Sequence, residues 1–300
     1  MTGRPGRPGR LAAVQALLEL HSHRRARLVL DGDYTSVFRG RGTDFEDLRE
    51  YVPGDPVSDI DWKATARAGK PLVRRYLPEH KNHLLLLVST GRSMTAVAPD
   101  GTSKLQLALD VAGVFAHLAI RHRDVVGAVF GDAGGLAAIA PRGSRAHAEY
   151  LLQRLSDETV DPDGPESDLP AVLDLAVRSR LPHGIAVLIT DDADLGPNGA
   201  RSLTMLHARH QIMVVRIADM NLADAGALDP FDVETGLRVP DEVRWHPRLR
   251  YEAATVTSVR AQTIERALAT RGIAHGRVTG QDDLVETLIG VLERHRHAGR

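Results

Sequence analysis

Hydroxyl and carboxyl side chains follow two strongly apolar stretches of the sequence. The run Leu84–Val88 leads into Ser89, Gly91 and Ser93, and a later apolar run ends at Asp191. Apolar residues without polar alternation predict strands buried on both faces, as in a parallel sheet. The carboxyl ends of parallel strands form the edge where ligands bind. If the two strands are neighbours, these side chains lie close together.

One chemistry for this group of residues is metal binding. Ser167 and Asp168 open a later helix and are expected near the same edge, which adds another hydroxyl. Oxygen ligands of this kind suit Mg²⁺ better than zinc. The turn after the first strand supplies no carboxylate, so only weak Mg²⁺ affinity is expected. The alternative is that these hydroxyls cap helix ends.

A second chemistry makes Ser93 the nucleophile of a serine hydrolase. The order Gly91, Arg92, Ser93 after a buried strand resembles the start of a G-x-S-x-G nucleophile elbow. Asp191 and then His275, with His207 as the other candidate base, complete the residue types of a triad. Thr95 stands at the second glycine position, where a β-branched side chain would crowd the strained turn. This departure weighs against the hydrolase interpretation.

Composition excludes several other classes of function. The 300 residues contain 38 Lys+Arg and 39 Asp+Glu, a formal net charge of −1, so no nucleic acid or anionic membrane surface is expected as a partner. Cysteine is absent, which excludes disulfides and a thiol nucleophile and is compatible with a cytoplasmic location. No apolar run approaches the roughly 18–20 residues of a spanning helix, so no membrane insertion is expected. No phosphate-binding loop or H-E-x-x-H motif is present.

The hydrophobic pattern predicts an α/β fold with a doubly wound, mostly parallel sheet of Rossmann-like type. Residues 1–10 are expected to be a disordered tail, residues 11–82 a helix (11–20) followed by a charged segment, and residues 83–300 the α/β domain. Within that domain residues 218–247 are expected to be irregular. The predicted strands are 84–88, 125–130, 136–140, 184–190, 211–217 and 274–278, and the predicted helices 104–121, 146–155, 169–179, 198–209, 256–270 and 281–297.

The charged segment between the first helix and the domain is dense in both signs of charge. Apolar residues such as Trp62 lie between the charges, and we expect them to hold the segment against the domain. Such a density of carboxylates and guanidiniums indicates either an internal ion-pair network or a surface for another protein. The candidate partner-binding residues are Arg39, Arg41, Asp44, Arg49, Tyr51, Asp55, Asp61, Trp62 and Arg67.

This segment resembles the signature of a bacterial domain-of-unknown-function family, number fifty-eight, the YeaD-like proteins. Its pattern R-x-Y-x-x-G-D-x-x-x-x-I-D-W-x-x-x-A-R is specific, and the resemblance covers the chain from about residue 30. Many members of that family also carry N-terminal membrane helices, which are not expected here. The matching residues are Arg49, Tyr51, Gly54, Asp55, Ile60, Asp61, Trp62, Ala66 and Arg67.

The resemblance implies a von Willebrand factor A-like domain with a metal-ion-dependent adhesion site. In that motif Ser89 stands where the family has Asp, Gly91 stands where it has the first Ser, and Ser93 keeps the second. Ser167 matches the loop hydroxyl and Asp191 the late Asp. Two of the five positions have lost their ligand type, which implies a degenerate site and no resident cofactor. The implied role is a non-catalytic adaptor or chaperone partner of a MoxR-type AAA+ ATPase, with a Mg²⁺-dependent binding switch as an alternative.

Overall fold

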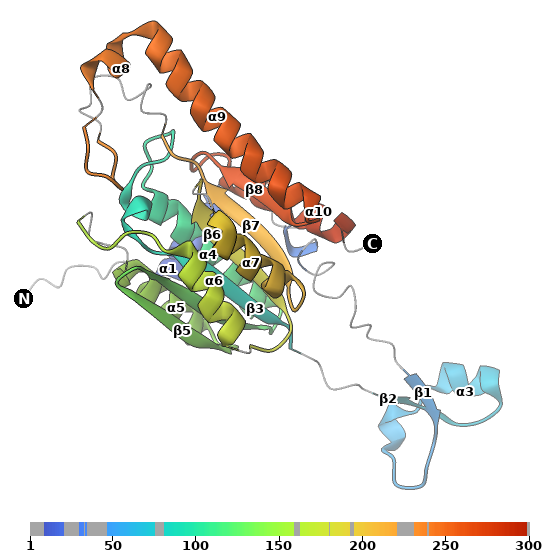
Figure 1. Ribbon diagram of the computed structural model, residues 1–300. Helices are drawn as coiled ribbons and strands as arrows, with labels where there is room; N and C mark the ends of the chain where they lie inside the picture. The colour runs from blue at the N-terminus through green and yellow to red at the C-terminus, as the bar shows by residue number, and fades with distance from the viewer. Residues whose placement is uncertain are drawn as a thin grey trace, which may run out of the picture.

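The computed structural model contains one α/β body and one small charged unit, joined by segments outside the described residues (Figure 1). The predicted tail, up to residue 8, lies outside the described residues. The described residues are 9–20, 30–32, 34, 47–75, 81–158, 163–179, 181–192, 195–220, 231–238 and 240–298.

The body is built on a six-stranded sheet in the order β5-β4-β3-β6-β7-β8. All neighbouring strands are parallel except β4 and β5, which form the antiparallel hairpin predicted from the sequence. The prediction of a mostly parallel α/β sheet is therefore confirmed. The strands are β3 (His83–Ser89), β4 (Val125–Asp132), β5 (Gly135–Arg142), β6 (Ile185–Asp191), β7 (Gln211–Ile217) and β8 (Ala274–Val278).

The central strand β3 shows why the apolar run has no polar alternation. Leu84, Leu86 and Val88 pack into the core on one face of the sheet, while Leu85 and Leu87 pack into the core on the other. One face is covered by α1 (Arg10–Leu20), α4 (Lys104–Arg121), α5 (Arg145–Glu158) and α10 (Leu284–Ala298). The other is covered by α6 (Leu169–Arg178), α7 (Gly196–His207) and α9 (Pro247–Thr270).

The first helix, α1, packs with the body and not with the charged segment. Leu11, Val14 and Leu18 are buried in the core that α4 and α5 share with the sheet. Val14 lies so close to Gly113 of α4 that a methyl group on that glycine would overlap it. In the structure, the body therefore begins at α1, although the sequence pattern grouped this helix with residues up to 82.

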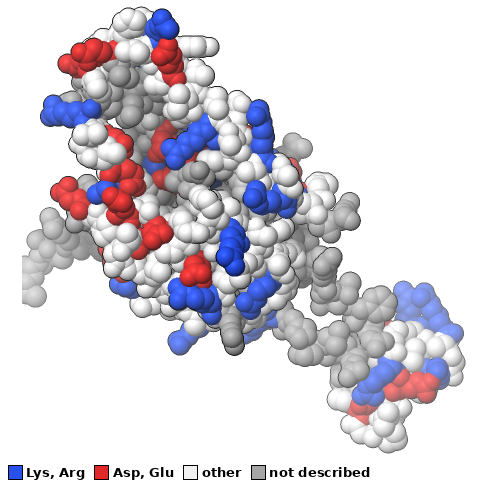
Figure 2. All heavy atoms as spheres, in the orientation of Figure 1, with Lys and Arg blue, Asp and Glu red and all other residues white. Residues whose placement is uncertain are grey.

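Residues 47–75, here called the charged unit, contain four short elements. Strands β1 (Asp47–Glu50) and β2 (Leu72–Arg75) pair antiparallel, and η1 (Val57–Asp59) and α3 (Trp62–Ala68) lie between them in sequence. Figure 1 shows the unit standing apart from the body, and Figure 2 shows both signs of charge on it with uncharged surface between. Val52 and Trp62 are exposed, so the expected packing of these apolar residues against the body is not found.

The helices near the carboxyl terminus also differ from the sequence-based expectation. Residues predicted to be irregular contain α8 (Asp241–Trp245), and α9 begins at Pro247, well before the predicted start at residue 256. Figure 1 shows α8 and the first turns of α9 projecting from the body. Because this part of α9 is largely exposed, it lacks the apolar periodicity from which a helix is predicted. None of the described helices is long and apolar enough to cross a membrane.

Candidate functional site

The carboxyl ends of β3, β6 and β7, here called the rim, bring Ser93 and Ser167 into contact. Ser93 lies in the 3₁₀ turn η2 (Arg92–Thr95) that follows β3, and its Oγ is 2.6 Å from Oγ of Ser167. The loop before α6 is also held by a hydrogen bond of 2.9 Å from the Arg92 amide to the Pro165 carbonyl. Gly91 permits this approach, because a side chain there would overlap the Ser167 backbone.

Arg92 ties three segments of the rim together. Its guanidinium lies 2.8 Å from a carboxylate oxygen of Glu166 in the loop before α6. The same group donates to the backbone carbonyl of Glu234 and lies 3.7 Å from that residue's carboxylate. Arg92 was not among the candidate residues from the sequence, because its place in the turn does not reveal which loops it reaches.

The carboxylate of Asp191 is paired with a buried lysine. Lys104, the first residue of α4, is 1% exposed, and its Nζ lies 3.2 Å from Oδ2 of Asp191. The ammonium also donates to the carboxylate of Asp219, which follows β7. Asp191 and Asp219 stand at the ends of neighbouring parallel strands. One ammonium therefore joins a helix to two strand ends.

Burial and charge act in opposite directions on this lysine. Burial alone would lower the pKa of Lys104, but the carboxylates of Asp191 and Asp219 outweigh it, and the net shift of the pKa is upward. Burial raises the pKa of Asp219, partly offset by the lysine charge. Lys104 is therefore charged throughout the physiological pH range.

A second buried charge network lies on the opposite face of the sheet. Arg216 of β7 is 1% exposed and donates to Asp192, at 2.7 Å, and to Glu265 of α9, at 2.8 Å. Arg277 of β8 also donates to Asp192, at 2.6 and 2.8 Å. The sequence shows Arg216 among the apolar residues of a predicted strand, but it does not show which carboxylates pair with this arginine.

In the charged unit, the candidate residues divide into internal and exposed groups. Arg49 pairs with Asp55, whose carboxylate also accepts from the Val52 amide, and this pairing lowers the pKa of Asp55. Asp61 caps α3 by accepting from two backbone amides at 3.0 Å. Tyr51 is half-buried, whereas Trp62 and Arg67 are exposed. Arg39, Arg41 and Asp44 lie outside the described residues.

A family model described as "Protein of unknown function DUF58" matches residues 47–261 of this chain. The match covers the charged unit, the strands β3 to β7 and the first part of α9. The chain belongs to the DUF58 family. This confirms the family resemblance drawn from the motif around Asp61 and Trp62.

Relatives of this DUF58 protein occur in mycobacteria. The uncharacterized proteins Rv1480 of Mycobacterium tuberculosis and Mb1516 of Mycobacterium bovis are each 29% identical over 297 residues, covering 96% of this chain and 91% of theirs. Among solved structures, a von Willebrand factor type A protein from Catenulispora acidiphila matches with 12% identity and a TM-score of 0.41, covering 74% of this chain and 43% of its own. An aerotolerance-related membrane protein from Bacteroides fragilis matches with 16% identity and a TM-score of 0.42, covering 71% and 98%.

The donor set at the rim of the DUF58 protein does not fit a divalent cation. Of the predicted ligands Ser89, Gly91, Ser93, Ser167 and Asp191, only the last carries a charge, and Lys104 already neutralises it. The Ser89 hydroxyl is buried without a hydrogen-bond partner in the described part of the chain. Nor do the described residues contain a group of three or more His, Asp or Glu side chains suited to a metal.

The residues of the alternative hydrolase site are not brought together. His207 ends α7, shortly before β7 begins, and therefore lies at the amino-terminal edge of the sheet, opposite the rim. His275 lies in the edge strand β8, where it is in register with Val214 in the middle of β7. Ser93 has Ser167 as its hydrogen-bond partner. The expectation of a Ser93 triad is corrected, because neither histidine lies at the rim.

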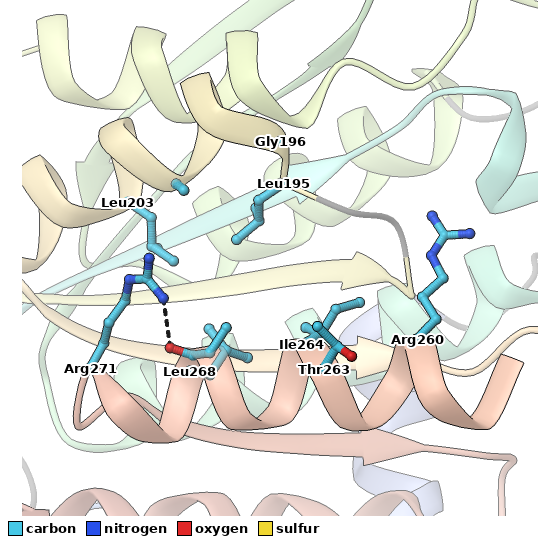
Figure 3. Close-up of a pocket in the computed structure, with 10 residues that line it drawn as sticks. Leu195, Gly196, Leu203, Arg260, Thr263, Ile264, Leu268 and Arg271 are labelled. Carbon is cyan, nitrogen blue, oxygen red and sulfur yellow. Dashed lines mark hydrogen bonds between the residues drawn. The ribbon is translucent and has the colours of Figure 1, made fainter. Parts of the chain in front are cut away.

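A cavity of about 410 Å³ lies between α7 and α9, separate from the predicted site residues (Figure 3). Leu195 and Leu203 on one side face Ile264 and Leu268 on the other. Arg260 and Arg271 lie toward its two ends, and Arg271 donates to the Ala267 carbonyl at 2.7 Å. The described lining residues include no carboxylate or histidine that could act as a general base. The cavity therefore has mainly apolar walls, with an arginine toward each end.

Proposed function

We propose that this DUF58 protein is a non-catalytic protein-interaction module whose partner binds the charged unit. The observation that carries the proposal is the exposure of Trp62, which is 65% accessible at the start of α3. Exposed tryptophan and arginine side chains dominate the energetics of many protein interfaces. Arg67 lies five residues after Trp62 on the same short helix, about 140° further around its axis, and is also exposed.

The shape of the charged unit supports the same proposal. Val52 and Val57 are exposed as well as Trp62, so the unit presents apolar side chains to solvent among its charges. The Arg49–Asp55 pair and the Asp61 cap hold the turns that carry these side chains. In this proposal, the internally paired residues fix the conformation of the unit, and the exposed ones contact the partner.

The proposed partner class is a MoxR-type AAA+ ATPase, and the proposed role is that of an adaptor or chaperone partner. The family resemblance supplies this partner, and a cytoplasmic location is part of the same proposal. The von Willebrand factor A-like character of the body is consistent with protein binding. The body's rim then acts as a fixed scaffold in this proposal, because the candidate base residues do not reach Ser93.

A binding experiment with matched tryptophan variants tests the proposal. Purified full chain is titrated with a MoxR-type ATPase from the same organism, in ATP, in ADP and without nucleotide. Trp62→Ala and Arg67→Glu are each expected to weaken binding by about tenfold or more, which corresponds to about 1.4 kcal/mol or more of lost binding energy. Both variants are expected to keep the wild-type melting temperature, because neither side chain is buried.

Trp245→Ala is the matched control, since Trp245 of α8 is 64% exposed on the body. This variant is expected to bind as the wild type does. Absence of binding in all three nucleotide conditions would exclude this partner class. Equal weakening by Trp62→Ala and Trp245→Ala would show that the charged unit is not the specific contact.

A further inference from the structure

We infer that the ammonium of Lys104 is the resident cation of the rim, in the position where a divalent metal would otherwise neutralise Asp191. The inference concerns the body alone and does not depend on the proposed partner. It predicts that the rim is assembled without Mg²⁺ and does not respond to it. Lys104 has two carboxylate partners, and the acidic groups around it are paired with other cations of the chain.

The backbone fixes Lys104 at the meeting point of η2, β6 and β7. Its amide donates to the carbonyl of Ala96, the residue that follows η2, at 2.9 Å. This bond holds the start of α4 beside the end of η2. Its Nζ reaches Asp191, the last residue of β6, and Asp219, two residues beyond the end of β7. The side chain therefore spans the same strand ends that a metal bound at the rim would join.

The energetics favour a permanent ammonium at this place. A buried charge is costly unless it is paired and hydrogen-bonded, and Lys104 is almost completely buried. An ammonium has three donors, and two of them are accounted for by Asp191 and Asp219. Asp219 is the more accessible partner, with 44% of its side chain exposed. The body therefore surrounds the ammonium on its inner side, and the carboxylate of Asp219 covers it on the side that faces solvent.

Other acidic side chains at the rim are also matched to cations of the chain. Asp192 is held by Arg216 and Arg277, and Glu166 by Arg92. A divalent cation prefers several anionic oxygens, and to obtain them it would have to displace a guanidinium or the ammonium of Lys104. The pairing extends across both faces of the sheet, which indicates a rim neutralised by side chains.

Without the ammonium of Lys104, the rim is expected to bind a divalent cation. In Lys104→Ser, Asp191 and Asp219 lose their shared counter-charge. The carboxylates of these two residues then face each other across the position that the ammonium occupied. These are the hard ligands that Mg²⁺ and Mn²⁺ take.

The test measures thermal unfolding of the full chain in EDTA, in MgCl₂ and in MnCl₂, each cation at about 10 mM. The wild-type melting temperature is expected to change by less than about 1 °C between these conditions. Lys104→Ser is expected to melt lower than the wild type in EDTA and to regain about 3 °C or more with MnCl₂. Lys81→Ser, which removes an exposed lysine of the body, is the matched control and is expected to behave as the wild type.

One double variant and one measurement on the wild type complete the test. Lys104→Ser combined with Asp191→Asn is expected to lose the rescue by MnCl₂, because the carboxylate that would bind the cation is gone. If Lys104→Ser does not fold, calorimetric titration of the wild type with Mn²⁺ decides: no binding heat supports the inference. Stabilisation of the wild type by either cation, or a folded Lys104→Ser that no divalent cation stabilises, would overturn it.

Discussion

At the scale of single residues, the rim depends on small side chains that let two loops touch. Ser93 and Ser167 share a hydrogen bond of 2.6 Å, and Gly91 leaves the space in which the Ser167 backbone lies. Gly91 therefore supplies close packing between η2 and the loop before α6.

Gly91→Ala is expected to destabilise the protein by about 1–3 kcal/mol, the usual cost of forcing an extra carbon into a packed site. The added methyl group would overlap the backbone of Ser167 and push the loop before α6 away from η2. Urea unfolding followed by circular dichroism measures the change.

Gly135→Ala is the matched control, because nothing lies within 4 Å of the position that a Cβ would take there. This variant is expected to stay within about 0.5 kcal/mol of the wild type. A Gly91→Ala protein as stable as this control would show that the loop before α6 can move away from η2 without a loss of stability.

At the scale of elements, buried charges connect strands and helices that the hydrophobic core alone does not orient. Lys104 connects α4 to the ends of β6 and β7, and Arg216 connects β7 to α9. Asp192 receives two arginines from β7 and β8. Each network therefore adds directional contacts between elements that also share the apolar core.

Asp192→Asn is expected to cost about 3–5 kcal/mol, because it leaves the buried guanidinium of Arg216 without its enclosed counter-charge. Glu265→Gln removes the other carboxylate on the same arginine, but that side chain is 44% exposed and water replaces it. Its expected cost is below about 1 kcal/mol. Thermal and urea unfolding of the two variants compare them directly. Similar costs for both would mean that solvent reaches Arg216.

The elements of the body could be predicted from the sequence because their residues repeat with a clear period. The run Leu84–Val88 predicts a central strand, and β3 lies between β4 and β6 with both faces buried. The charged unit gave no such signal. Its strands are four residues each, and α3 buries no residue, so no apolar period marks them.

The sequence predicted that Ser93 and Ser167 lie at the same edge of the sheet, but it did not predict the charged residues beside them. Ser93 and Ser167 could be placed together because both follow elements that end or begin at the rim. Lys104 and Arg216 could not, because a lone charge in an apolar pattern does not reveal the carboxylate that it meets in space. His207 and His275 have the right residue types in the right order, yet order along the chain says nothing about which end of the sheet a side chain reaches.

At the scale of the whole molecule, the chain combines parts of very different stability. The body buries both faces of a six-stranded sheet under helices. Among the described residues of the charged unit, Val73 is the one apolar residue that is buried. A segment shorter than about 40 residues rarely folds stably without a disulfide, metal or partner, and a two-stranded sheet is marginal in water.

Hydrogen–deuterium exchange is therefore expected to separate the two parts. Strands β1 and β2 form a two-stranded sheet, with further contacts from Leu72 to Thr65 and from Val73 to Ile60 inside the charged unit, so their amides open at little cost and exchange early in the isolated chain. Amides of β3 and β6 lie between other strands and exchange only on global unfolding. Adding a bound partner is expected to slow exchange in residues 47–75 and leave the core strands unchanged. Protection of β1 and β2 equal to that of β3 in the isolated chain would contradict this and would mean that the charged unit is already docked on a surface of the same protein.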